Sequence, residues 1–166
     1  NSFKLKNNLK IKLITLLSEC SGHSGVAGGQ FSDLNFEKKK VPLKKIIEMQ
    51  IKKTGKLFSF CCVVPLIISK KIKFYKKFDK IGSNIGLLFQ IADDLIDYKG
   101  KTKKVGKKTN KDKKIGKATL ISLLGYKNTI KYSENLKLNI FKSLDTFGDK
   151  ASDLKDTIEY IMVRSK

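Results

Sequence analysis

The stretch from Gly86 to Asp97 constrains the fold more than any other part of the sequence. Its polar residues recur at intervals of three and four, which places them on one stripe of an α-helix. The remaining positions are apolar and cover most of the helix circumference, and a helix of that kind is usually buried. The polar stripe holds Gly86, Gln90, Asp93, Asp94 and Asp97.

Carboxylates on a buried helix face need a partner. Unpaired buried carboxylates are costly, and like charges one turn apart repel each other. A divalent cation would remove both objections, and oxygen ligands without a nearby His or Cys favour Mg²⁺, which substrate phosphates usually complete. The pattern therefore predicts a Mg²⁺ site formed by Asp93, Asp94 and Asp97. An exposed helix end with scattered acids is the alternative, because such a pattern alone is a weak signal.

A lysine-rich segment follows this helix directly. Residues 99–117 contain ten lysines in nineteen positions, with glycines at 100, 106 and 116. A turn of carboxylates that holds a cation and a loop that supplies ammonium donors are the two halves of a diphosphate site. We therefore interpret the helix and the loop together as a site for a magnesium-bound diphosphate.

Composition supports a single all-α domain over residues 1–166. The chain has two prolines, 40% hydrophobic residues and helical periodicity along most of its length. A net charge of +21 would ordinarily suggest nucleic acid. However, Arg164 is the single arginine among 36 basic residues, whereas nucleic-acid readers favour the planar guanidinium group. We therefore predict no nucleic-acid partner and keep a lysine-rich nucleic-acid binder as a distant alternative.

Several features indicate a cytoplasmic protein. The longest apolar run, Leu57–Ile68, is too short to cross a bilayer, so it predicts a core helix and no membrane span. Cys20, Cys61 and Cys62 are odd in number and lack metal-site spacing, so we expect reduced, buried thiols. Asn1 opens the chain without an initiator Met or a signal-peptide pattern, so we expect a piece of something longer, or a processed or partial sequence.

Two short stretches each admit two interpretations. Residues 21–33 are rich in Gly and Ser and carry Gln30 and Asp33 at the spacing of one helix face. They fit a flexible linker, or a place where a helix and a ligand approach closely. Lys53 and Thr54, just before the apolar run, fit a surface turn or a phosphate contact at the mouth of a cavity.

Helix boundaries follow from local signals. We expect a basic loop over residues 34–41, with Pro42 in the first turn of the next helix. Gly125 is expected to interrupt a later apolar stretch. A final amphipathic helix is expected over residues 151–163, with Arg164 placed favourably against its dipole.

Taken in order, these stretches resemble the trans-isoprenyl diphosphate synthases, specifically the short-chain farnesyl and geranylgeranyl group. Spaced motifs in family order are specific, although any one alone is weak. The resemblance covers essentially all 166 residues and matches roughly the C-terminal half of such an enzyme. The matching segments are Gly25-Val-Ala-Gly-Gly-Gln30 with Asp33, Val41-Pro42-Leu43, Lys53-Thr54-Gly55, Gly86, Phe89-Gln90, Asp93-Asp94-Leu-Ile-Asp97, Gly106-Lys107, Gly116-Lys117-Ala118-Thr119, Leu123-Leu124-Gly125, and Tyr160-Ile161 through Lys166.

The resemblance implies a fold and a reaction. The fold is a helical bundle of the isoprenoid synthase type around a deep cavity, here incomplete. The reaction is Mg²⁺-dependent head-to-tail condensation of isopentenyl diphosphate with an allylic diphosphate, and we expect farnesyl diphosphate as the product. It also implies a homodimer, or a partner that supplies a complementing N-terminal half. The first aspartate-rich motif of the family, its arginines and the isopentenyl diphosphate pocket have no match in this sequence.

The resemblance also implies residue roles. Asp93, Asp94 and Asp97 would form the second aspartate-rich motif and hold Mg²⁺ against the allylic diphosphate. Thr54 and Gln90 would lie near the reacting carbon and, with Lys53, form the catalytic group. The residues implied in binding the diphosphate are Gln30, Lys53, Lys107 and Lys117. A smaller departure is Leu120-Ile121, where an aromatic residue and a proline commonly follow the Thr.

One alternative from another functional class stays open beside the synthase. A non-catalytic remnant or subunit could retain the same residues and bind magnesium-diphosphate without turnover. The intact set of acids and lysines counts against decay of the site. Binding of geranyl diphosphate without product formation would support this alternative.

Overall fold

The computed structural model describes residues 4–104 and 118–164, which form helices and turns and no strands. The π-helical turn Ile51–Gly55 joins α3 to α4, and 3-10 segments at Ile72–Phe74 and Asp145–Ala151 precede α5 and α8. The prediction of an all-α fold is confirmed. The helices are α1 (Asn7–Ser21), α2 (Val26–Phe36), α3 (Leu43–Gln50), α4 (Lys56–Ile68), α5 (Tyr75–Lys104), α6 (Leu120–Leu124), α7 (Tyr126–Leu144) and α8 (Ser152–Val163).

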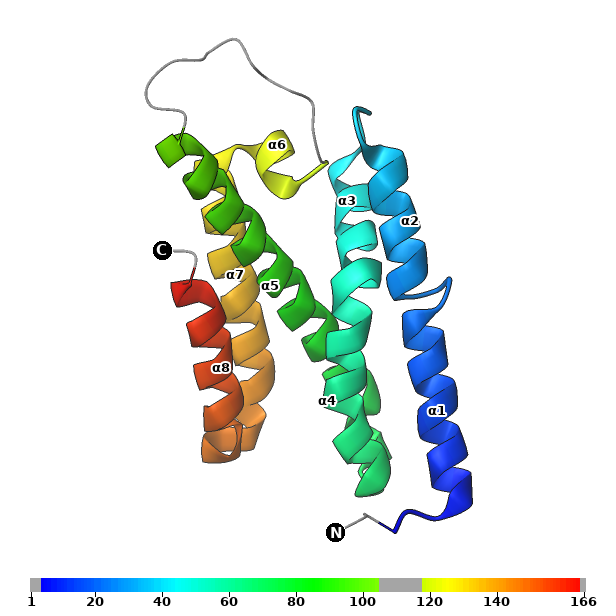
Figure 1. Cartoon of the computed structure of the whole chain (residues 1–166). Coiled ribbons are helices and arrows are strands. Elements are labelled where there is room, and N and C mark those ends of the chain that lie inside the picture. The colour runs from blue at the N-terminus through cyan, green and yellow to red at the C-terminus, as the bar shows by residue number, and fades with distance from the viewer. Residues whose placement is uncertain (1–3, 105–117, 165–166) are drawn as a thin grey trace.

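Helix α5 runs through the middle of the molecule (Figure 1). On one side, α3, the π-helical turn and α4 form an almost continuous column, with α1 and α2 outside it. On the other side, α7 and α8 form an antiparallel pair, and α6 lies near the C-terminal end of α5. The arrangement is a helical bundle organised around the helix that carries the aspartates.

Two apolar clusters explain why α5 is central. Ile81, Ile85, Leu88 and Ala92 of α5 pack with apolar residues of α7 and α8. Leu87, Ile91 and Leu95 of the same helix pack with residues of α3 and α6. Because both sides of α5 are covered, the helix is buried as its nearly all-round apolar sequence predicts.

Small residues let α5 approach the α3–α4 column closely. A Cβ added to Gly86 would lie 2.6 Å from the Cα of Gly55, and one added to Gly82 would lie 2.6 Å from the Cα of Ser59. Since these neighbours are backbone atoms, the two helices touch main chain to main chain along this line. The contact brings the π-helical turn directly against the polar stripe of α5.

Three expected boundaries are corrected by the structure. Helix α2 begins at Val26, so residues 26–33 are helical rather than a linker, and the helix continues to Phe36 into the expected basic loop. Pro42 lies just before the first helical residue rather than in the first turn, and its carbonyl accepts hydrogen bonds from the N–H groups that follow. The lysine-rich segment begins inside α5, which extends to Lys104.

Other expectations are confirmed or corrected in single residues. Gly125 interrupts the chain between α6 and α7 with a φ of 76°, a value that favours glycine. The last helix, α8, ends at Val163 as expected. Cys20 is buried, Cys62 is half-buried and Cys61 is exposed, so the expectation of three buried thiols is confirmed at Cys20 and wrong at Cys61. Within the described residues, no helix is long and apolar enough to span a membrane.

Candidate functional site

The π-helical turn positions Lys53 and Thr54. Its backbone hydrogen bonds join residues five positions apart instead of four, as in the bond from the Lys56 N–H to the Ile51 carbonyl. Such turns occur in short pieces and often at functional sites. Helix α2 lies on the backbone of this turn, because a Cβ added to Gly29 would lie 2.2 Å from the backbone nitrogen of Lys53. The turn is therefore held between α2 on one side and α5 on the other.

An ion pair fixes the Lys53 side chain. The Nζ atom of Lys53 lies 2.6 Å from Oδ2 of Asp33 on α2, and both side chains are largely shielded from solvent. Sequence analysis noted Asp33 for its spacing from Gln30 and within a segment that resembles the family, but assigned it no role; the ion pair identifies it as a further residue of the site. Gln30 itself is exposed, and no hydrogen bond among the described residues links it to Lys53.

A chain of hydrogen bonds connects the π-helical turn to α5. The Thr54 hydroxyl donates to Oε1 of Gln90 over 3.2 Å. The amide nitrogen of Gln90 donates to Oδ1 of Asp94, also over 3.2 Å. On the other side, the amide nitrogen of Gln50 donates to Oδ2 of Asp94 over 3.2 Å. The structure therefore brings three predicted residues together and adds Gln50, which sequence reasoning missed.

The C-terminal helix reaches the same end of α5. An Nη atom of Arg164 donates to Oδ1 of Asp93 over 2.9 Å, between residues 71 positions apart in sequence. The guanidinium also lies over the Phe89 ring, 5.0 Å from its centroid. The sequence had suggested only a favourable interaction of Arg164 with its own helix dipole. Instead, the chain's single arginine is the partner of one of the predicted metal ligands.

The carboxylates do not converge on a single point. Asp93 faces Arg164, Asp94 faces two amides, and Asp97 is exposed. Among the described residues, no group of three or more His, Cys, Asp or Glu side chains is arranged to hold a metal ion. The oxygen-only donor set still suits Mg²⁺, which usually binds proteins through one or two carboxylates and keeps waters or phosphates as its other ligands. Lys107 and Lys117 lie outside the described residues.

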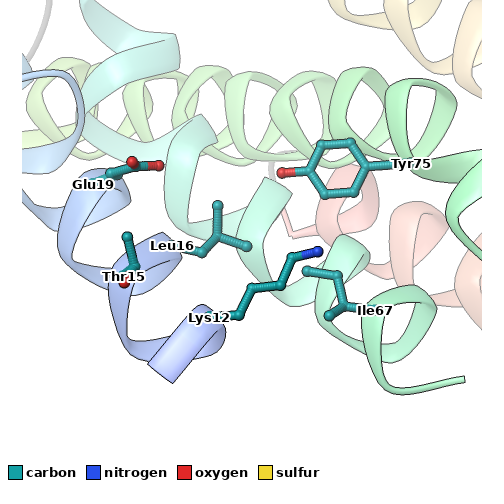
Figure 2. Close-up of a pocket in the computed structure, with 6 residues that line it drawn as sticks. All are labelled: Lys12, Thr15, Leu16, Glu19, Ile67 and Tyr75. Carbon is teal, nitrogen blue, oxygen red and sulfur yellow. The ribbon is translucent and has the colours of Figure 1, made fainter. Parts of the chain in front are cut away.

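A separate groove lies at the other end of the molecule. It has a volume of about 350 Å³ and runs between α1, the end of α4 and the start of α5, as Figure 2 shows. Burial raises the pKa of Tyr75 there, and the nearby charge of Asp79 raises it further. Tyr75 and Asp93 are separated along α5 by about 27 Å at the helical rise. The groove is therefore distinct from the site around Lys53 and Asp94.

Comparisons with known proteins place the chain beside a single family. The family model for polyprenyl synthetase matches residues 2–161. The farnesyl diphosphate synthase of Micrococcus luteus is 32% identical over 164 residues, covering 98% of this chain and 56% of the relative. The corresponding enzyme of Escherichia coli is 32% identical over 162 residues, covering 95% and 54%. The chain thus spans about half the length of these relatives.

Solved structures agree with this similarity. A geranyltransferase from Helicobacter pylori, complexed with magnesium and isoprenyl diphosphate, superposes with a TM-score of 0.78 at 26% identity, covering 97% of this chain and 53% of that one. The bundle described above is therefore that of the isoprenoid synthases, present over about half of their length.

Proposed function

The chain belongs to the polyprenyl synthetase family, and from this membership we propose that it forms part of a cytoplasmic, Mg²⁺-dependent prenyl diphosphate synthase. The enzyme condenses isopentenyl diphosphate with an allylic diphosphate to give farnesyl diphosphate. The observation that carries the proposal is the hydrogen-bonded chain from Thr54 through Gln90 to Asp94, with Lys53 beside it. This arrangement gathers hydroxyl, amide, carboxylate and ammonium groups from two segments of the fold, the π-helical turn and α5.

Lys53 binds the diphosphate leaving group in this proposal. As the allylic C–O bond breaks, the electron pair leaves with the diphosphate, and negative charge grows on its oxygens. A preorganised ammonium group stabilises that charge without reorganising during the reaction. Asp33 holds the Lys53 side chain in place when no diphosphate is bound. Lys107 and Lys117 would supply further ammonium donors, and Gln30 a further contact to the diphosphate.

Thr54 and Gln90 act on the other fragment, the allylic cation. Their oxygen atoms carry partial negative charge, and the hydrogen bond between them fixes both orientations. The double bond of isopentenyl diphosphate then attacks the cationic carbon, and a proton leaves the adduct to the released diphosphate. The role of the two side chains is electrostatic, so their placement matters more than their acidity.

Asp93, Asp94 and Asp97 would hold the Mg²⁺ in this scheme. When bound, the cation neutralises diphosphate charge as a Lewis acid and so favours departure of the leaving group. Because Arg164 occupies one oxygen of Asp93, the guanidinium would have to share or release that carboxylate when the cation binds.

A companion surface is also proposed. Apolar or small side chains are exposed along one stripe of α4, at Leu57, Cys61, Pro65 and Ile68. Contiguous apolar surface of this kind marks a site of association. Exposed apolar residues also occur on α1 and α2, at Ile11, Ile14 and Phe31. A second copy of the chain, or a companion supplying the other half of the fold, would cover these surfaces.

A prenyl-transfer assay tests the proposal. Labelled isopentenyl diphosphate and geranyl diphosphate would be mixed with Mg²⁺ and the chain, alone and co-expressed with a companion half taken from a relative. We expect product in the mixture and its loss with Asp93→Ala. The exposed Asp153→Ala on α8 is a matched control, which should leave the product unchanged. Absence of product in the mixture, although both parts fold and associate, would contradict the proposal.

Two observations favour the non-catalytic alternative. The carboxylates diverge, and Asp93 already has a cationic partner in Arg164. A subunit that binds magnesium-diphosphate without turnover would accommodate both features. Equilibrium binding of geranyl diphosphate separates the two, because the alternative requires Mg²⁺-dependent binding and no product in any mixture.

A further inference from the structure

Gln50 is a buried amide beside the aspartates. It is the last residue of α3, where the helix passes into the π-helical turn, and its exposed fraction is 2%. Its amide lies against Asp94 of α5, across the contact between the two helices. A carboxylate can only accept hydrogen bonds, so the atom that faces Asp94 is the amide nitrogen. The amide orientation is therefore set by chemistry.

This orientation leaves the carbonyl oxygen of Gln50 without a partner. Oε1 is buried, and it receives no hydrogen bond within the described part of the chain. A buried acceptor without a donor costs about 1–3 kcal/mol, and native proteins rarely retain one without a reason. Because both amide atoms share one carbon, the unpartnered oxygen lies in the same neighbourhood as the Asp94 carboxylate. Any donor that satisfies it must tolerate that negative charge.

We propose that Gln50 is a positioning residue for the cation-binding carboxylate of Asp94, and that its carbonyl oxygen accepts a hydrogen bond from a water ligand of that cation. The inference rests on the proposed function, because it takes the cation to bind at the aspartates of α5. A water bound to a divalent cation is a strong donor and carries positive charge to the carboxylate. It therefore satisfies both requirements of the buried oxygen.

The two amides fix Asp94 in a complementary way. Gln50 binds one carboxylate oxygen from α3, and Gln90 binds the other from α5 itself. A carboxylate bound at both oxygens from different elements cannot rotate without breaking one of these bonds. Residues that orient a metal ligand in this way typically change metal affinity by about 10–100-fold when they are mutated.

Mn²⁺ binding to the whole chain, followed by electron paramagnetic resonance, tests the proposal. Mn²⁺ takes the same oxygen ligands as Mg²⁺ and gives a direct signal for free ion. We expect Gln50→Met to raise the Kd for Mn²⁺ about tenfold. The same variant should change the urea midpoint of unfolding little, because it removes both the hydrogen bond to Asp94 and a buried acceptor that has no partner, and these two effects oppose each other. Gln50→His, which keeps an N–H donor and an acceptor, should recover most of the affinity.

The outcomes separate the two proposals. Asn139→Met, on the exposed side of α7, is the control and should change neither quantity. If the unchanged chain binds Mn²⁺ and Asp94→Ala abolishes binding while Gln50→Met has no effect, this inference is wrong and the proposed function stands. A parallel loss of affinity and stability in Gln50→Met, without recovery in Gln50→His, would indicate a purely structural role and also overturn it. No Mn²⁺ binding by the unchanged chain would overturn this inference, whereas the proposed function is decided by the prenyl-transfer assay of the mixture.

Discussion

Replacing Gly86 by Ala should push α5 away from the π-helical turn. The added Cβ would lie 2.6 Å from the Cα and 2.9 Å from the backbone nitrogen of Gly55. Carbon atoms at optimal contact are about 3.5–4.0 Å apart, so the helices must separate by roughly an ångström along this line. No side-chain rotation can relieve the clash, because both neighbouring atoms belong to the main chain.

The size of the effect follows from two opposing terms. Overpacking of a well-packed interior costs about 1–3 kcal/mol, and contact with backbone places this substitution at the upper end. Ala gains about 1 kcal/mol over Gly in a helix interior. We therefore expect a net loss of about 2 kcal/mol in the free energy of unfolding, which corresponds to a fall of about 1 M in the urea midpoint for an m-value of about 2 kcal/mol/M.

Gly100 provides the matched control on the same helix. Nothing lies within 4 Å of a Cβ added there, so Gly100→Ala should keep only the favourable helix-propensity term. Both variants would be unfolded in urea and followed by far-ultraviolet circular dichroism. Opposite signs are expected, with a fall in the midpoint for position 86 and a small rise for position 100. Equal shifts in the same direction would refute the reasoning that backbone contact, rather than helix propensity, decides the outcome.

Three further predictions concern single contacts. A double-mutant cycle by urea unfolding would combine Asp33→Asn with Lys53→Met. We expect a coupling free energy of about 1–2 kcal/mol, because the ion pair is largely buried. A coupling below about 0.3 kcal/mol would contradict a structural ion pair. Arg164→Ala should cost less than about 1 kcal/mol of stability, because its ion pair with Asp93 is partly exposed. The same variant should lower the Kd for Mn²⁺, because it removes a cation that competes for Asp93. A higher Kd would count against that competition. With a thiol-specific chromogenic reagent at pH 8, Cys61 should react first because it is exposed. Burial raises the pKa of Cys62 to about 11 and keeps that thiol protonated. A fast phase of the reaction that survives Cys61→Ser would show the assignment to be wrong.

The sequence predicted those features that repeat along one element. The burial of α5 could be read from its periodicity, because apolar residues surround a single polar stripe. In α4 the same approach failed for Cys61, since nearly every position of the run is apolar and no periodicity distinguishes the covered side from the exposed one. The prediction was therefore good where polar and apolar residues alternate and poor where they do not.

Contacts between elements left no local signal. Arg164 and Asp93 are 71 positions apart, and neither position predicts the other. Nothing in the sequence distinguishes Gln50 from the other polar residues near it, and its importance appears only once α3 lies against α5. Asp33 carried a weak signal, its spacing from Gln30, but the partner that gives it meaning lies on another helix. The roles of Lys107 and Lys117 stay predictions.

The π-helical turn makes this region sensitive to chain length as well as to residue identity. A π-helical turn is equivalent to one residue inserted into an α-helix, and here it lies directly between the end of α3 at Gln50 and the start of α4 at Lys56. Deleting one residue there would let the hydrogen bonds revert to the ordinary spacing and rotate α4 by about 100° relative to α3. The apolar face of α4 would then miss α5, although every surviving side chain stayed the same. Single-residue insertions and deletions between positions 51 and 55 should therefore be among the rarest changes tolerated in proteins that share this turn.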